Sequence, residues 1–137
     1  MRRVNDVGEV QEFGPALTTW RVAPLSASLA QAPNLRSRWI IEGRGEAPRP
    51  DVALVEWELR GAGWQDRHPH TEINYVLEGE LHVEADGQTV VLGPGDCVRV
   101  APGETGRYWA PTYARMLAVY GANPDGAATE ATQYWET

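Results

Sequence analysis

Two histidines and two acidic residues lie within seven positions of the chain, at Asp66, His68, His70 and Glu72. Imidazole nitrogens and carboxylate oxygens bind divalent transition metals, and they also act as general acids and bases. The four positions share one parity, so an extended backbone would direct their side chains to one face of a sheet. This stretch is therefore the strongest candidate for a reactive site.

Pro69 interrupts the stretch in its middle. Because proline has no N–H group, it cannot donate to a strand ladder and usually marks an edge or an end of a strand. We therefore expect one strand to end near His68, a tight corner to follow, and a new strand to begin near Glu72. Such a corner can gather imidazole and carboxylate groups around one point, as a divalent metal requires.

Short apolar segments separated by Gly and Pro turns run along the rest of the chain. Their β-branched and aromatic content predicts strands at residues 18–22, 38–41, 52–59, 72–79, 81–83, 89–92, 97–100, 107–109 and 114–120. Within 52–59, Val55 and Trp57 alternate with Glu56 and Glu58, which is typical of a half-buried strand. No segment predicts a long helix, so the pattern indicates a β-sandwich or barrel.

The stretch from Asp66 to Gly79 resembles the first motif of the cupin family. That motif has a His-x-His pair, a Glu after it, and a Gly seven residues beyond the Glu, a spacing that Glu72 and Gly79 reproduce. A second stretch, residues 95–106, resembles the second cupin motif. The resemblance covers residues 60–110 and implies an all-β cupin-type jelly roll, whose two sheets enclose a pocket.

Two of the four metal-binding positions of the family pattern are altered. When the motif is aligned on Glu72, the family's second His falls on His68 and its first on Asp66. Gly106 stands where the second motif carries its His. The resemblance implies a divalent ion, Fe, Mn, Zn or Ni, on His68 and Glu72, and Asp66 or His70 would complete its ligands. His70 either turns inward to give two imidazoles and one carboxylate, or faces solvent at the corner.

Five further residues are expected at or near the enclosed pocket. Trp57 and Asn74 are predicted to point into the barrel as an aromatic wall and a polar contact. Gly106, which has no side chain, would widen the pocket. Tyr108 and Glu104 flank it and could contribute a proton or a hydrogen bond, although an exposed loop position is the better expectation for Glu104.

The composition limits the partners and the location of the protein. The net charge of −7 argues against nucleic acid or an anionic membrane as a partner. All twelve basic residues are Arg, so Schiff-base chemistry and a lysine base are excluded. The lone Cys97 cannot form an internal disulfide and is expected to be a small buried hydrophobe. No apolar run approaches the ~20 residues of a membrane span, which favours a cytoplasmic protein.

The 137 residues suit one domain with three segments. We expect an N-terminal arm with edge strands at 1–50, a barrel core at 51–122, and a polar tail at 123–137. Tyr134 and Trp135 would anchor that tail to the body or to a second subunit. The apolar surface of the arm and the tail predicts a homodimer.

The sequence leaves three functions open. The leading hypothesis is a metal-dependent cupin enzyme that catalyses isomerisation, cyclisation, lyase or oxygen-dependent chemistry on a small metabolite. The abundance of Arg, Ala, Gly and Pro is typical of a high-GC bacterium, where secondary metabolism is one setting. The alternatives are a metal-free acid–base enzyme and a non-catalytic ligand-binding or sensory module. The candidate catalytic residues are His68, Glu72, Asp66 and Tyr108.

Overall fold

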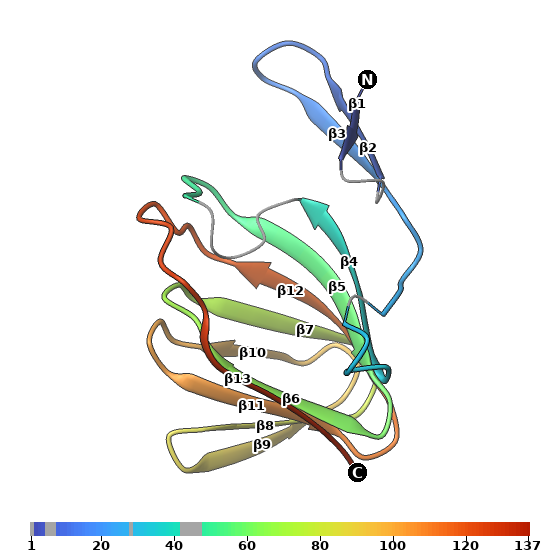
Figure 1. Cartoon of the computed structure of the whole chain (residues 1–137), viewed down its shortest axis with the longest axis vertical. Coiled ribbons are helices and arrows are strands. Elements are labelled where there is room, and N and C mark those ends of the chain that lie inside the picture. Colours follow the sequence, from blue (N-terminus) through green and yellow to red (C-terminus); the bar gives the residue numbers. More distant parts are fainter. Residues whose placement is uncertain (1, 5–7, 28, 42–47) are drawn as a thin grey trace.

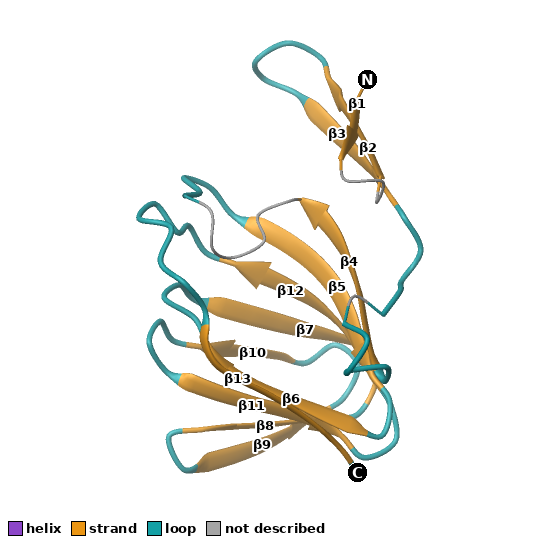
Figure 2. Cartoon of the chain, in the orientation of Figure 1, coloured by secondary structure: helices purple, strands orange, loops and turns teal. Residues whose placement is uncertain are grey.

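The computed structural model describes residues 2–4, 8–27, 29–41 and 48–137. Every regular element in these residues is a β-strand (Figure 2). The described residues contain no helix that could cross a membrane. The strands are β1 (Arg2–Val4), β2 (Gly8–Glu12), β3 (Thr18–Val22), β4 (Leu35–Ile41), β5 (Ala53–Leu59), β6 (Ala62–Arg67), β7 (Glu72–Gly79), β8 (Leu81–Ala85), β9 (Gln88–Leu92), β10 (Cys97–Val100), β11 (Thr105–Ala110), β12 (Ala114–Tyr120) and β13 (Glu130–Glu136). The predicted all-β fold is confirmed.

Two five-stranded antiparallel sheets face each other and form the barrel (Figure 1). The first has the order β10-β7-β12-β5-β4, and the second has the order β13-β6-β11-β8-β9. Strands that follow one another in the chain, such as β5 and β6 or β6 and β7, lie in different sheets. This repeated crossing is the winding of a jelly roll, so the predicted cupin-type architecture is confirmed.

Inward-facing side chains of both sheets form one apolar core. Every second residue of β11 is buried, as is nearly every second residue of β12, which is the period of two that a strand imposes. The largest fully buried apolar side chains are Tyr108, Leu59, Leu81, Met116 and Val76. Because this core fixes which faces of β6 and β7 point inward, it also fixes the direction of the polar residues on those faces.

The corner around Pro69 forms as predicted. Strand β6 ends at Arg67, and β7 begins at Glu72 in the opposite sheet. Two backbone hydrogen bonds hold the corner: the N–H of Gly103 donates to the carbonyl of His68 at 2.9 Å, and the N–H of Gly121 donates to the carbonyl of Thr71 at 3.0 Å.

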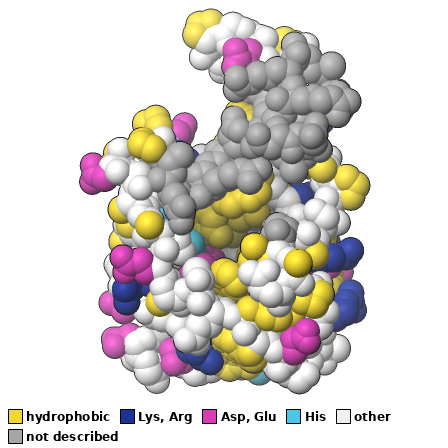
Figure 3. Space-filling view, viewed as in Figure 1, with side chains coloured by type: hydrophobic (Ala, Val, Ile, Leu, Met, Phe, Trp, Pro, Cys, Tyr) yellow, Lys and Arg dark blue, Asp and Glu magenta, His cyan; other side chains and the backbone are white. Residues whose placement is uncertain are grey.

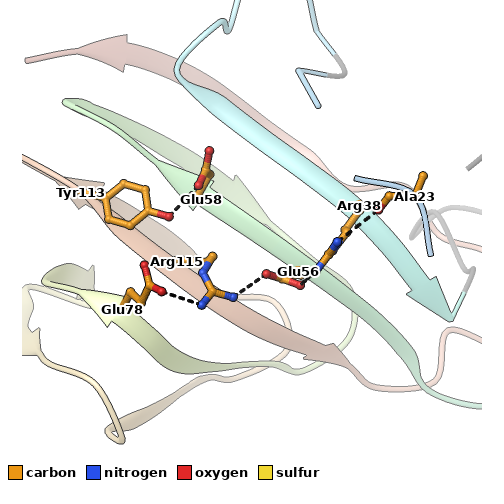
Figure 4. A network of polar contacts seen from close by, with 7 residues as sticks. All are labelled: Ala23, Arg38, Glu56, Glu58, Glu78, Tyr113 and Arg115. Carbon is orange, nitrogen blue, oxygen red and sulfur yellow. Dashed lines mark hydrogen bonds and ion pairs between the residues drawn. The ribbon is translucent and has the colours of Figure 1, made fainter. Parts of the chain in front are cut away.

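The outer face of β5 differs from the predicted half-buried strand, because its glutamates are buried as well. Glu56 is only 5% exposed. It accepts hydrogen bonds from Arg38 on β4 and Arg115 on β12, each at 2.6 Å (Figure 4). Burial acts to raise the pKa of Glu56, but the hydrogen bonds from both guanidinium groups outweigh it and lower that pKa.

Glu58 is buried in the same way, with 3% exposure. Its carboxylate accepts hydrogen bonds from Arg36 and from the hydroxyl of Tyr113, the latter at 2.7 Å. The two glutamates of β5 are therefore paired with groups from β4, on one side, and from β12 and the turn before it, on the other.

Residues 130–136, within the segment predicted as a polar tail, form strand β13 at the edge of the second sheet. The strand pairs with β6, and the indole of Trp135 lies directly over Gly63. The hydroxyl of Tyr134 accepts a hydrogen bond from the N–H of Asn34 at 3.2 Å. Tyr134 and Trp135 therefore anchor this segment to the body of the same chain.

The N-terminal strands β1, β2 and β3 form a separate small sheet beyond the barrel (Figure 1). Phe13 and Leu17, in the β2–β3 connection, are 51% and 57% exposed. The predicted homodimer would give these side chains a partner surface, and it stays a prediction.

Cys97 is exposed, so its predicted burial is wrong. It begins β10, the edge strand of the first sheet, opposite Tyr75, which is 44% exposed on the same outer face. The alternation of the strand sends Val98 and Val100 inward instead.

We predict that Gly63→Ala destabilises the fold by displacing β13. A Cβ atom at this position would overlap the indole of Trp135, and overpacking of this kind costs about 1–3 kcal/mol. Chemical denaturation measures the effect. Gly93→Ala is the matched control, because a Cβ there meets only one carboxylate oxygen at 4.0 Å. Equal stability of the two variants would contradict the prediction.

Candidate functional site

Asp66, His68 and Glu72 converge at the point where the chain crosses from the second sheet to the first. The Nε2 atom of His68 lies 3.0 Å from Oδ2 of Asp66 and 2.9 Å from Oε1 of Glu72. The side chain of His68 is 11% exposed, that of Asp66 is 8% exposed, and that of Glu72 is 3% exposed. One imidazole and two carboxylates thus share a small volume that is largely closed to water, and these three residues form a group that could hold a metal ion.

These short contacts are not aligned hydrogen bonds. Nε2 of His68 and Oε1 of Glu72 are both buried and have no hydrogen-bond partner of proper geometry among the residues that the structure describes. Two neighbouring ligands of an octahedral ion, each about 2.1 Å from it, are roughly 3.0 Å apart. The observed separations of 2.9 and 3.0 Å match this spacing. The donor set therefore fits a divalent ion.

A second layer of hydrogen bonds orients each of the three side chains. The indole N–H of Trp64 donates to Oδ2 of Asp66 at 2.8 Å, and the side-chain amide of Asn74 donates to Oε2 of Glu72 at 2.7 Å. Nδ1 of His68 lies 2.7 Å from Oγ1 of Thr129. Outer partners of this kind fix the rotamers of metal ligands and tune the ligands' basicity.

The partner of Glu72 is itself held by a further residue. The indole N–H of Trp57 donates to Oδ1 of Asn74 at 2.8 Å, and Asn74 is fully buried. The O and N atoms of the Asn74 amide are therefore assigned by their two neighbours, because only the oxygen can accept from an indole. The chain from Trp57 through Asn74 to Glu72 aims one carboxylate oxygen at the cluster.

The two carboxylates raise the pKa of His68 to about 10. Burial, the largest single influence, acts to lower that pKa, but the close carboxylates of Asp66 and Glu72, which stabilise the protonated ring, outweigh it. For Glu72 the direction is also upward, because burial and the nearby charge of Asp66 disfavour the ionised form. Without a metal, the cluster therefore retains a proton on His68 at neutral pH.

His70 is buried at 3% exposure, so the alternative that it faces solvent is wrong. Its ring stacks on that of His68 at a centroid distance of 4.5 Å and also packs against Tyr120. Its Nδ1–H donates to the carbonyl of Thr71 at 3.0 Å. Burial lowers the pKa of His70 and favours a neutral ring. His70 thus supports the cluster from one side, and it lies outside the group of residues whose ligand atoms converge.

Gly106 does not widen the pocket, contrary to the sequence-based expectation. A Cβ at Gly106 would lie 2.9 Å from both Cε2 and the hydroxyl oxygen of Tyr108. Both residues point inward because they are two apart on β11, and the phenol fills the space over the glycine. Tyr108 is 1% exposed, and burial, followed by the charges of Glu72 and Asp66, raises the pKa of its hydroxyl well above the usual range.

A pocket of about 280 Å³ adjoins the cluster. Its lining is mainly aromatic and aliphatic: Leu29, Leu35, Ser37, Trp39, Val55, Trp57, Trp64, Asp66, His68, Glu72, Tyr120, Thr129 and Thr132. The space-filling view is hollowed between the sheets, and the side chains visible inside the hollow are largely hydrophobic (Figure 3).

Of the five residues predicted at or near the pocket, only Trp57 lines it. Trp57 lines the pocket, and Asn74 lies directly behind it. Gly106 and Tyr108 are not among the lining residues. Glu104 is exposed in the turn before β11, because the turn formed by Ala101 and Gly103 projects it outward. This is the exposed loop position that was the better expectation for Glu104, and Glu104 does not line the pocket.

Sequence reasoning missed the functional contributions of Thr129, Trp64 and Tyr120. Thr129 reaches His68 from 61 positions away along the chain, and no local pattern marks it. Trp64 could have been found, because it has the same parity as Asp66 and precedes it by two residues on one strand. Tyr120 ends β12 and packs against both histidine rings.

Comparison with known proteins assigns the class. Residues 53–120 match the family model for the cupin domain. The solved structure of a putative ethanolamine utilization protein EutQ from Salmonella typhimurium superposes with a TM-score of 0.64 at 21% identity, covering 85% of this chain and 95% of that one. An RmlC-like cupin from Shewanella frigidimarina gives 0.60 at 22% identity, over 73% and 84% of the two chains. The chain belongs to the cupin superfamily.

A curated relative is also similar in sequence. The protein named acetate kinase EutQ of Salmonella typhimurium is 40% identical over 69 residues, which cover 50% of this chain. The match spans only 26% of that relative's own length. The similarity therefore concerns the cupin domain and leaves most of the relative unmatched.

We predict that the metal-free protein loses stability as pH rises toward 10, through the titration of His68. Its pKa is raised from 6.5 to about 10 on folding, so its stabilising contribution is complete below about pH 6.5 and disappears as pH passes 10. Denaturation curves measured across this range in the presence of a chelator test the effect.

His68→Gln should remove this part of the pH dependence. His82→Gln is the control, because His82 lies on β8, where it stacks on Trp109 and contacts Glu80 away from the cluster. The same decline in wild type and His68→Gln would contradict the assignment.

We also predict that Gly106→His cannot by itself restore the fourth metal position of the family pattern. The new imidazole would collide with the Tyr108 ring, so the variant should unfold at lower denaturant concentration. Combining it with Tyr108→Ala makes room and should recover stability relative to the single variant. Greater stability or tighter zinc binding in Gly106→His alone would show that the phenol does not occupy this space.

Proposed function

We propose that this protein is a small-molecule cupin enzyme whose reaction depends on a divalent metal held by Asp66, His68 and Glu72. The observation that carries the proposal is the convergence of three metal-binding side chains, in which Nε2 of His68 lies 3.0 and 2.9 Å from one carboxylate oxygen each of Asp66 and Glu72. Each ligand also has its own orienting partner. Fe, Mn, Zn and Ni all suit a set of one imidazole and two carboxylates.

A bound ion would supply Lewis-acid polarisation of a carbonyl or enol oxygen on the substrate. The protein's own residues bind and orient that substrate. Trp39, Trp57 and Trp64 present aromatic surface to the pocket beside the cluster, so the reacting group can lie against Asp66 and Glu72 while its apolar part is shielded from water.

Tyr108 serves as a positioning residue in this proposal. Its hydroxyl is buried without a hydrogen-bond partner of proper geometry among the described residues, and burial, followed by the charge of Glu72, raises its pKa, so it stays protonated. A neutral phenol beside a carboxylate can donate a hydrogen bond and so stabilise the charged form of Glu72 that binds a cation. Because Tyr108 lies outside the pocket lining, it acts through Glu72.

The reaction classes that suit such a site are isomerisation, cyclisation, lyase chemistry and oxygen-dependent oxidation of a small metabolite. A role in bacterial secondary metabolism is part of the same proposal. The Salmonella EutQ protein bears a kinase name, but the similarity covers only 26% of its length, so the proposal concerns cupin chemistry alone.

A metal-free acid–base enzyme is the second candidate, and one observation favours it. His68 holds a proton between two carboxylates with a pKa of about 10, so an imidazolium is available as a general acid. A binding or sensory module that holds a ligand without chemistry is the third candidate.

Metal analysis of protein purified without chelator tests the leading proposal. We expect about one divalent ion per chain in wild type and none in His68→Ala, with the strand content of the circular dichroism spectrum unchanged. Glu72→Gln should weaken the metal by roughly 10–100-fold, because it removes one charged ligand or its orientation. Glu78→Gln, which removes an exposed carboxylate on the outer face, is the control. If wild type holds no metal and His68→Ala keeps the turnover of wild type, both enzymatic candidates are ruled out.

A further inference from the structure

The pocket wall combines four aromatic rings with two carboxylates. Trp39, Trp57, Trp64 and Tyr120 all line the same pocket of about 280 Å³. The electron-rich faces of indole and phenol rings attract cations, and tryptophan does so most strongly. The pocket volume lies near the lower end of the range for small-molecule sites, roughly 300–1,000 Å³, so a ligand of few heavy atoms fits it.

The acidic side chains of the pocket also favour a cationic ligand. Asp66 and Glu72 bring two acidic side chains to the pocket wall, and His68 is the one basic side chain among the described residues that line it. Glu72 is 3% exposed, and its Oε1 atom has no aligned hydrogen-bond partner in the pocket region. A carboxylate or phosphate entering this low-dielectric space would be repelled by like charge.

No arginine lines the pocket among the described residues, and the chain has no lysine at all. The alternation of β4 explains this arrangement. Ser37 and Trp39 face the pocket, while Arg36 and Arg38 face outward, where they bind Glu58 and Glu56. The guanidinium groups of this strand are therefore paired on the opposite side of the sheet.

Among the described residues, Arg49 is the one buried arginine, and it does not line the pocket. Its Nη1 donates to the carbonyls of Asp51 and Gly121 at 2.9 and 2.7 Å. These contacts place it at the end of β12, outside the pocket lining.

We infer that the pocket selects a small cation, an amine or quaternary ammonium compound, over uncharged and anionic molecules of the same shape. This inference rests on the proposed function, because it takes the pocket beside the cluster as the substrate site. The aromatic rings would surround the cationic head, and the carboxylates of Asp66 and Glu72 would complement its charge.

The proposal predicts a coupling between the cation and a divalent metal. An ion on the cluster neutralises the two carboxylates, so it should weaken the binding of a cationic ligand while the attraction of the aromatic rings remains. By thermodynamic linkage, the cationic ligand should weaken the metal by the same factor.

Three molecules of one shape test the inference directly. They are choline, its uncharged carbon isostere tert-butylethanol, and the carboxylate of tert-butylacetic acid. We expect metal-free protein, titrated by calorimetry and by tryptophan fluorescence, to bind choline about tenfold more tightly than the alcohol. The carboxylate should bind more weakly than either.

Two variants separate the contributions. Asp66→Asn should reduce the advantage of choline over the alcohol several-fold, because it removes one pocket charge and keeps the shape. Trp39→Leu should reduce the same advantage by removing one aromatic face. Glu78→Gln changes the net charge equally on the outer face, and it should leave the ratio of the two affinities unchanged.

The inference is overturned if the carboxylate binds as tightly as choline, if the alcohol equals choline, or if none of the three binds. Suppose that the three molecules do not bind in the order choline, alcohol, carboxylate, while wild type holds a metal that His68→Ala loses. Only this inference then fails. If the order is present but no metal is ever held, the metal proposal fails, and the site stands as a cation-binding pocket.

Discussion

A buried imidazole between two buried carboxylates is the interaction on which the rest of the site depends. Bringing Asp66 and Glu72 together inside a barrel is costly unless a positive charge lies between them. His68 provides that charge as a proton carrier, and a divalent ion could provide it instead. The hydrogen bonds that Trp64 and Asn74 donate to the carboxylates, and the one that the Nδ1–H of His68 donates to Thr129, hold the three groups at this separation. The corner at Pro69 makes the arrangement possible, because it turns the chain from one sheet to the other between His68 and Glu72.

Buried carboxylates have different partners on the outer face of the first sheet and in the space between the two sheets. On the outer face, Glu56 and Glu58 are covered by arginines and a tyrosine, so each charge is neutralised within the protein. Between the sheets, Asp66 and Glu72 have a single imidazole, that of His68, between them. The proposed metal ion or cationic ligand would supply positive charge between the sheets, as the arginines do on the outer face.

Much of the fold follows from local sequence, whereas only part of the site does. Alternation and Gly or Pro turns locate the strands of the barrel, and Pro69 with the spacing of Glu72 and Gly79 locates the corner. The predicted burial of Cys97 was wrong because β10 is an edge strand, which only the assembled sheet shows. The solvent-facing alternative for His70 was wrong because its ring packs against His68 and Tyr120. The filling of the Gly106 space by Tyr108, and the reach of Thr129 to His68, are contacts between side chains across the fold. Local periodicity carries no information about such contacts.

Anomalous X-ray scattering from crystals grown with manganese or zinc tests the central claim most directly, because it locates an ion independently of activity. The account predicts one strong peak in the barrel, at a distance of about 2.0–2.2 Å from Nε2 of His68 and from one carboxylate oxygen each of Asp66 and Glu72. A peak elsewhere with none at this position, at metal concentrations that saturate the crystals, would contradict it. The three residues would then form a proton-holding set rather than a metal centre.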